Sequence, residues 1–145
     1  MKIFINLFLS ILISSQSYPV FAHDLENAIK SDDRTKEFKS RDKYRHPYET
    51  LTFFRIESNM TVVELSPGSG WYTEIFANYL HEPGNLIAAH FDADSSRAYF
   101  KNSRTKFEKK IASSPIYNNV SIVDLSSQLA LAQSVDAVVT FRNLH

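Results

Sequence analysis

Glycine is scarce in this chain, and two of its three glycines, Gly68 and Gly70, stand in one short segment, 66–70 (SPGSG). A glycine has no Cβ, so it permits backbone dihedrals closed to other residues and lets a ligand approach the main chain closely. Glu64 precedes this segment within an otherwise apolar run, where a buried carboxylate needs a partner. These residues predict a loop that binds a ligand with polar groups. Two alternatives stay open: a tight turn without a ligand, and a Glu64 carboxylate paired with Arg55 or a backbone amide.

A second group of candidate residues closes the chain, where Arg142, Asn143 and His145 follow an apolar run. Histidine titrates near neutral pH and can act as a general base, so these residues are candidates to face a substrate. The alternative is a set of ordinary polar residues at the end of a strand. We expect no metal site from His46, His90 and His145, because their separations match no local ligand spacing.

The elements that must position these residues alternate along the chain. Short apolar runs predict strands over 61–65, 86–91, 120–123 and 135–141, and apolar residues at helical spacing predict helices over 71–80, 95–111 and 126–132. Strands that alternate with helices form a parallel sheet with right-handed crossovers. We therefore expect an α/β fold, a three-layer Rossmann-like sandwich with helices on both faces and the strand order 3-2-1-4. The 66–70 segment then lies at the carboxyl edge, where open α/β sheets bind ligands.

Composition excludes several classes of function. The 145 residues include 16 Lys and Arg against 16 Asp and Glu, and 43% of them are hydrophobic. A balanced charge argues against nucleic acid as a partner, because phosphate neutralisation needs a basic excess. The absence of cysteine excludes a thiolate zinc site, a disulfide scaffold and a cysteine nucleophile. The remaining chemistry must use oxygen, imidazole or a bound cofactor.

Residues 1–22 predict a secretory signal peptide. Lys2 supplies the positive start, 3–13 is the apolar run, and Ala22 ends a small-residue cleavage signal. The apolar run is too short to span a bilayer, which needs roughly 20 residues, so we expect no stable membrane insertion after cleavage and a periplasmic or secreted protein. An uncleaved amino-terminal anchor is the alternative.

The mature chain divides into an arm and a domain. Residues 23–45 are strongly charged and predict a mobile or loosely helical arm. Pro47 then opens a short helix whose apolar side, including Phe53, docks on the rest of 46–145. The chain stops directly after the fourth strand, whereas doubly wound sheets usually continue. We expect 46–145 to be the amino-terminal portion of a larger domain with one uncovered sheet edge.

The segment 62–70 (VVELSPGSG) resembles the first motif of class I S-adenosylmethionine-dependent methyltransferases, in which an acid precedes a glycine-rich loop. The wider sequence, from Arg41 to the end, is similar to one group of predicted exported methyltransferases. The segments that carry this second resemblance are 45–47 (RHP), 49–51 (ETL), 53–54 (FF), 60–65 (MTVVEL), 70–75 (GWYTEI), 88–92 (AAHFD) and 136–143 (DAVVTFRN).

The resemblance implies roles for single residues. The methionine part of S-adenosylmethionine would lie among Glu64, Ser66, Pro67, Gly68 and Gly70. An acid after the second strand would bind the ribose, and a polar residue after the third would meet the adenine.

The chain departs from the family pattern at two positions. Ser66 replaces the first glycine of the loop, so the backbone there must accept a Cβ. His90 aligns with the usual acid of the second strand, which leaves Asp92 as the ribose ligand. Asp124 is the candidate near adenine. The alternative for Asp92 and its neighbour Asp94 is a turn or helix cap, and for Asp124 a helix cap before Ser126.

The resulting prediction is an S-adenosylmethionine-dependent methyltransferase. Aromatic residues of the amino-terminal cover, with Trp71 and Tyr72, favour an apolar small-molecule acceptor, and their alternative is plain packing. A nicotinamide oxidoreductase is disfavoured, because its fingerprint needs a third glycine at position 73, which is Thr. A non-catalytic or truncated cofactor-binding protein is the other alternative.

Overall fold

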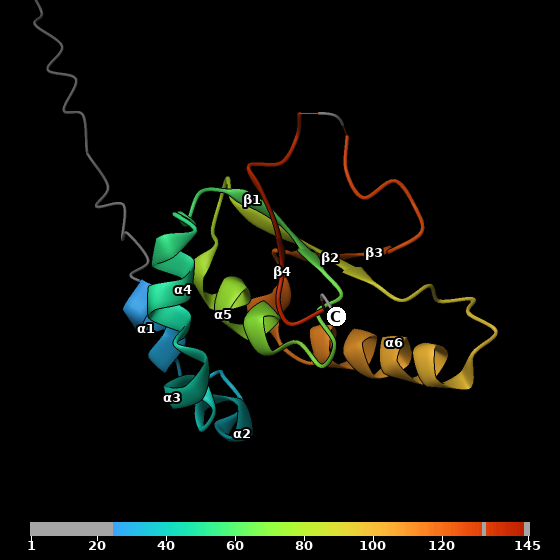
Figure 1. The fold of residues 1–145 in the computed structure, drawn as a ribbon, viewed down its shortest axis with the longest axis horizontal. Coiled ribbons are helices and arrows are strands. Elements are labelled where there is room, and N and C mark those ends of the chain that lie inside the picture. The colour runs from blue at the N-terminus through green and yellow to red at the C-terminus, as the bar shows by residue number, and fades with distance from the viewer. Residues whose placement is uncertain (1–24, 132, 144–145) are drawn as a thin grey trace, which may run out of the picture.

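The centre of the fold is a four-stranded parallel sheet, seen in a computed structural model that describes residues 25–131 and 133–143 (Figure 1). Its strands are β1 (Thr61–Leu65), β2 (Asn85–His90), β3 (Val120–Asp124) and β4 (Ala137–Thr140), in the order β3-β2-β1-β4. All three pairings are parallel, with Glu64 of β1 opposite Ala88 on one side and Val139 on the other. The predicted strand order and the Rossmann-like α/β class are confirmed.

Two crossover helices cover one face of this sheet, whereas the prediction placed helices on both faces; no helix of the described residues lies between β3 and β4 to cover the other. They are α5 (Trp71–Tyr79), between β1 and β2, and α6 (Ala98–Ile111), between β2 and the short 3-10 helix η1 (Pro115–Tyr117) that precedes β3. Helix α5 is buried almost all round: Ile75 and Phe76 have no exposed surface and pack with Val62 of β1 in the core. Helix α6 lies farther out, below the sheet in Figure 1, and buries only Arg104 and Phe107.

The helix predicted over 126–132 is wrong for the residues that the structure describes there. Residues 125–131 form turns and bends that leave β3 on the side opposite α5 and α6 (Figure 1). Leu131 is 74% exposed, so this segment has no apolar stripe docked on the sheet. A one- or two-turn helix without such a stripe is marginal in water, because nucleation costs more than its few hydrogen bonds return. Helix α6 also begins three residues later than predicted.

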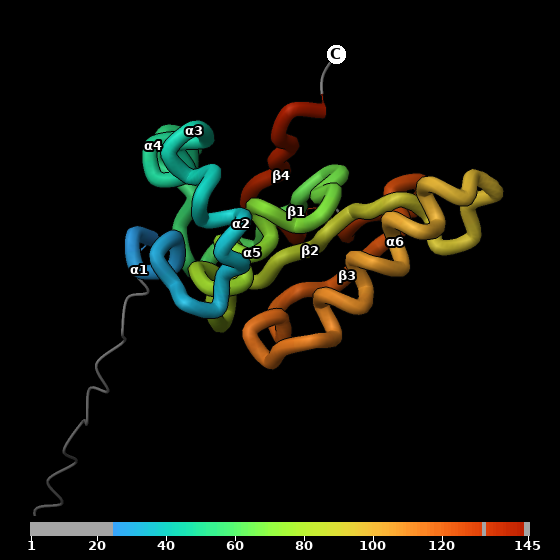
Figure 2. The backbone as a smooth tube through the Cα atoms, turned by 90° about the horizontal axis from the view of Figure 1, so that it is seen from below, coloured from blue at the N-terminus to red at the C-terminus, as the bar shows by residue number. Residues whose placement is uncertain are grey.

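The charged segment 25–45 is helical and docked on the domain, where the sequence predicted a mobile or loosely helical arm. It forms α1 (Leu25–Lys30), α2 (Lys36–Lys39) and α3 (Asp42–Arg45), which lie with α4 (Pro47–Phe53) beside α5 (Figure 2). Arg34 is only 2% exposed and donates to both carboxylate oxygens of Asp42, at 2.8 and 3.0 Å. The indole nitrogen of Trp71 donates to the Phe38 carbonyl oxygen at 2.9 Å. Two of the charges that predicted mobility, Arg34 and Asp42, are therefore paired within the fold.

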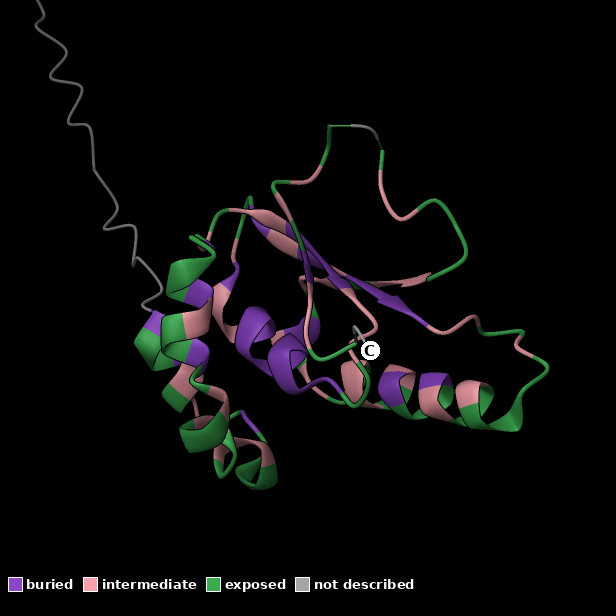
Figure 3. Cartoon of the chain, viewed as in Figure 1, coloured by how far each residue is buried: buried purple, intermediate pink, exposed green. Residues whose placement is uncertain are grey.

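Burial divides α4 differently from the prediction (Figure 3). Leu51 is fully buried in the core, whereas Phe53 is 81% exposed, so Phe53 does not belong to the docking side. Pro47 stands at the first helical position as predicted.

The third glycine, Gly84, lies where the turn before β2 approaches another backbone segment. A Cβ on Gly84 would meet the Ser58 carbonyl oxygen at 2.5 Å, so this position has no room for a side chain.

Candidate functional site

The glycine loop, residues 66–70, joins the carboxyl end of β1 to α5 through three left-handed residues. Ser66, Gly68 and Gly70 have φ values of 55°, 61° and 86°. The Ser66 amide donates to the Ala89 carbonyl oxygen at 2.8 Å, which ties the loop to the end of β2. Ser66 thus accepts the conformation that the sequence analysis required of it, with its backbone held by β2.

The two glycines of the loop serve different purposes. A Cβ on Gly68 would meet nothing within 4 Å, so the backbone there faces open space. A Cβ on Gly70 would lie 3.1 Å from the Phe107 ring and 3.4 Å from Thr73. Gly70 therefore permits close packing of α5 against α6, and Gly68 is the position where a ligand can reach the main chain.

The Glu64 carboxyl group lies buried beneath the loop, with 3% of the residue exposed. The Thr73 hydroxyl donates to its Oε2 at 2.7 Å, so its partner is neither Arg55 nor a backbone amide. Burial raises the pKa of Glu64 to about 7, although the Thr73 hydrogen bond works in the opposite direction. A carboxyl group with this pKa changes charge near neutral pH, which is common at functional sites.

His90 is a residue of the site whose role the sequence analysis missed. Its Nδ1 accepts the Phe91 amide hydrogen at 2.8 Å, so the ring proton is on Nε2, which donates to the Gly68 carbonyl oxygen at 3.1 Å. The ring is 1% exposed, and burial lowers its pKa. The sequence signal is a histidine at the position where the motif that the chain resembles has an acid. The structure uses that histidine to hold the glycine loop.

Asp92 and Asp124 lie near each other beyond β2 and β3 but have different partners. Asp92 accepts the Ser126 amide at 3.2 Å and lines a hollow of about 340 Å³, the strand-end hollow. Asp124 accepts from the Arg104 guanidinium at 2.6 Å and from the Ala93 amide at 3.3 Å. Asp92 does not cap α6, whose first turn has no side-chain cap, and Asp124 caps no helix, because residues 125–131 form turns and bends. The strand-end hollow is also lined by Phe91, Ser95, Phe100, Leu125 and Ser126.

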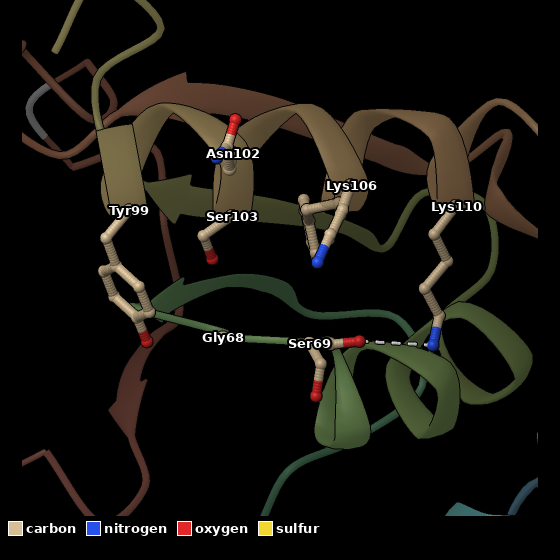
Figure 4. A pocket seen from close by; sticks show the side chains of 8 residues that line it. Gly68, Ser69, Tyr99, Asn102, Ser103, Lys106 and Lys110 are labelled. Atoms are coloured by element: carbon tan, nitrogen blue, oxygen red, sulfur yellow. Dashed lines mark hydrogen bonds between the residues drawn. The ribbon is translucent and has the colours of Figure 1, made fainter. Parts of the chain in front are cut away.

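A larger hollow of about 500 Å³, the lysine hollow, separates the glycine loop from α6 (Figure 4). Side chains from one stripe of α6 point toward Gly68 and Ser69 across it. Lys110 donates to the Ser69 carbonyl oxygen at 3.2 Å and pairs with the buried Glu74 carboxylate at 2.6 Å. The ion pair with Glu74 thus holds the Lys110 ammonium group in place to bind the loop at Ser69. The α6 residues that line the hollow are Tyr99, Asn102, Ser103, Lys106, Phe107 and Lys110.

Residues after β4 close the opposite side of the loop. The Asn143 amide donates to the carbonyl oxygens of Leu65 and Ser66, both at 3.3 Å. Arg142 is left-handed, with φ 63°, and exposed. The structure thus brings Asn143 to the glycine loop as a backbone clamp. His145 lies outside the described residues.

Arg142 also lines a third hollow, the arginine hollow, of about 280 Å³ between β4 and the amino-terminal helices. The rings of Tyr72 and Phe141 stack there with centroids 3.5 Å apart. Thr140 links it to the loop, since its hydroxyl donates to the Leu65 carbonyl oxygen at 3.3 Å. The lining residues are Tyr44, Arg45, Thr50, Phe54, Tyr72, Thr140, Phe141 and Arg142.

These features share the carboxyl edge of the sheet. The structure brings together Glu64, Gly68, Gly70 and Asn143, and leaves Asp92 one strand away in its own hollow. Among the described residues no group of three or more His, Asp or Glu side chains is placed to hold a metal ion. Within the same residues, no helix combines the length and apolar character needed to cross a bilayer.

Comparison with known proteins gives one solved structure to report. It is a cyclopropane-fatty-acyl-phospholipid synthase-like protein from Lactobacillus casei, at a TM-score of 0.44 and 11% sequence identity. The match covers 71% of this chain and 38% of that protein, so the chain spans well under half of its length. Neither a protein-family model nor a curated protein sequence matches the chain.

Proposed function

We propose that this chain binds S-adenosylmethionine at the glycine loop and takes part in transfer of its methyl group to a small organic acceptor. The observation that carries the proposal is the open space beside Gly68, at the carboxyl end of the central strand β1. A backbone that is left-handed, held from three sides and unshielded suits a ligand that contacts the main chain closely. The resemblance of 62–70 to the methyltransferase motif gives that ligand its identity.

The residues around the loop fit the chemical groups of this cofactor. Glu64 is buried near the carboxyl end of β1, two residues before the loop, and its ionised form would favour a cationic amino group. Asp92 lines the strand-end hollow, where a carboxylate can accept from ribose hydroxyls. The rings of Phe91 and Phe100 stack on each other with centroids 4.2 Å apart, and they form an apolar wall of that hollow suited to an adenine ring. Asp124 is not part of this set, because Arg104 engages it.

When bound, the cofactor supplies an electrophilic methyl group on a sulfonium. The contribution of the chain is then to hold the cofactor and the acceptor in line and to exclude water, since positioning supplies much of the rate in such displacements. His90 and Asn143 hold the backbone of the loop from both sides, which keeps the binding geometry fixed. His145 retains its proposed role as a base near the acceptor, and the test is the pH profile of His145→Ala.

Calorimetry with S-adenosylmethionine, its demethylated product and NAD tests the cofactor assignment. We expect binding of the first two and none of NAD. The variants Gly68→Ala and Gly68→Leu both carry the cost of a left-handed φ without β-branching but differ in size, so Leu should weaken binding much more than Ala. Tight NAD binding without S-adenosylmethionine would overturn the assignment. Binding without methyl transfer to any acceptor would favour the non-catalytic alternative.

We also propose that the protein is exported, on the pattern of residues 1–22. These residues lie outside the described part of the chain. Amino-terminal sequencing of protein recovered outside the cytoplasm should give His23 as the first residue. Recovery of the intact amino terminus in a membrane fraction would support the uncleaved anchor instead.

A further inference from the structure

The arginine hollow concentrates positive charge without a carboxylate to balance it. Its lining includes Arg45 and Arg142, and no carboxylate of the described residues forms an ion pair with either. Asp42 is the nearby acid, but Arg34 already occupies both of its oxygens, at 2.8 and 3.0 Å. Arginines left in this state, beside apolar rings, are the usual partners of carboxylates and phosphates.

Arg45 carries the strongest sign of a missing partner. Its Nε atom is buried and meets no hydrogen-bond acceptor among the described residues. Burial lowers the pKa of the Arg45 guanidinium, and the charges of Arg41 and Arg142 lower it further, against Tyr72 and Asp42. A bound anion would accept a hydrogen bond from the buried Nε–H group and would also reduce the repulsion between the guanidinium groups.

The rest of the hollow is apolar and adjoins the cofactor loop. The stacked rings of Tyr72 and Phe141 form its floor, and Phe54 lies 6.3 Å from Phe141 between ring centroids. Thr140 connects this floor to the carbonyl oxygen of Leu65, the residue directly before the glycine loop. The hollow therefore offers a flat apolar surface and two arginines next to the place assigned to the methyl donor.

We propose that the arginine hollow seats the methyl acceptor, and that the acceptor is an organic anion whose apolar, ring-sized body carries a carboxylate or phosphate held by Arg45 and Arg142. The acceptor role rests on the proposed function, because it needs a methyl donor at the loop. The preference for an anion does not, since it follows from this chain's own charges. The anionic group is the anchor, and a different atom of the body accepts the methyl group.

The test uses matched probes that differ in charge. 3-Phenylpropionate and phenyl phosphate present the two kinds of anion, and 3-phenylpropanamide is the neutral analogue. The Arg45 Cζ atom lies 4.6 Å from the ring centroid of Trp71, the single tryptophan of the chain. Anion binding at Arg45 should therefore change the fluorescence of Trp71. We expect calorimetry to show both anions, or the one that matches the natural group, binding at least about tenfold more tightly than the amide.

Two variants and one control decide the outcome. Arg45→Gln and Arg142→Gln should each remove most of the anion preference and leave amide binding unchanged. Lys43→Gln removes a charge from the same short helix, outside the hollow, and should behave as wild type. Arg142 is exposed and follows β4, so its variant keeps the test decisive where Arg45→Gln fails to fold. Equal affinity for anions and amide, or full preference in both arginine variants, would overturn the inference.

A parallel titration with S-adenosylhomocysteine separates the two proposals. If the protein prefers anions through its arginines but does not bind the cofactor, the arginine hollow is still an anion site, but its assignment to a methyl acceptor is overturned. Cofactor binding without anion preference would overturn this inference and leave the proposed function intact.

Discussion

Replacing the buried Glu64 by glutamine should make the fold more stable at alkaline pH and weaken its binding of the proposed cofactor. Glu64 is 3% exposed and has the Thr73 hydroxyl as its hydrogen-bond donor. Glutamine keeps an oxygen for that hydroxyl and removes the ionisable group. The variant therefore isolates the electrostatic cost of a carboxylate under the glycine loop from the shape of the side chain.

The magnitude follows from proton linkage. Burial raises the pKa of Glu64 from 4.5 to about 7, so between these two values the folded protein binds more protons than the unfolded chain. The contribution of Glu64 to the free energy of unfolding is then most favourable below pH 4.5 and falls as the pH rises to about 7. Above that pH, the ionised carboxylate lowers the free energy of unfolding by a constant amount of about 3 kcal/mol. About 2 kcal/mol of this loss lies between pH 5.5 and 8, which is about 6 °C in melting temperature for a chain of this size.

Thermal unfolding of wild type and Glu64→Gln at several pH values in this range gives the assay. His90 titrates too, with a pKa lowered by burial, but it is present in both proteins and cancels from the difference. The melting temperature of the variant should gain on wild type by about 6 °C from pH 5.5 to 8. Glu57→Gln, at an exposed site, should show no such gain. Parallel pH curves for wild type and Glu64→Gln would refute the assigned burial cost.

Two further pairs of variants test the separation of ligand contacts from structural contacts. Asp92→Asn should weaken S-adenosylmethionine binding about tenfold with little change in melting temperature. Asp124→Asn should lower the melting temperature, because the Asp124 carboxylate neutralises Arg104. Loss of cofactor binding in Asp124→Asn with an unchanged melting temperature would reverse these roles. In urea unfolding, Gly84→Ala should be far more destabilising than Gly68→Ala, because its Cβ would meet a backbone oxygen at 2.5 Å while Gly68 faces open space and costs only about 1–2 kcal/mol for its left-handed φ; similar losses would contradict the two packing environments.

The sequence was sufficient to predict the sheet because the strand signals are local. The run at 61–65 is short, β-branched and bounded by turn residues, and such runs separated by helices allow few topologies. The glycine loop was predictable for the same reason: few residues other than glycine adopt a left-handed φ readily. The helix over 126–132 failed because its apolar residues, such as the exposed Leu131, find nothing to pack against. Tertiary support decides short helices, and a single sequence does not show it.

The site residues divide along the same line. Glu64 and Gly68 were identified from their own neighbours in sequence, and the structure places both at the carboxyl edge. The role of Asp124 near adenine stays a prediction, and the sequence could not show its ion pair because the partner, Arg104, is 20 residues away and lies on α6. His90 was read as a departure from a family pattern, whereas its two ring nitrogens bind two backbone groups. A residue's type predicts what it can bond to, but only the fold shows which partner is within reach.

The charged amino-terminal segment belongs to the site, because a continuous set of contacts joins it to the glycine loop. The Thr35 amide donates to the Glu74 carboxylate at 2.9 Å, and the Thr35 hydroxyl donates to its other oxygen. Lys110 pairs with the same carboxylate at 2.6 Å and also donates to the Ser69 carbonyl oxygen. Glu74 is 1% exposed, so it depends on these donors for the cost of its burial. The segment that composition alone marks as a solvated arm thus supports the loop through Glu74, and it supplies Arg45 to the arginine hollow.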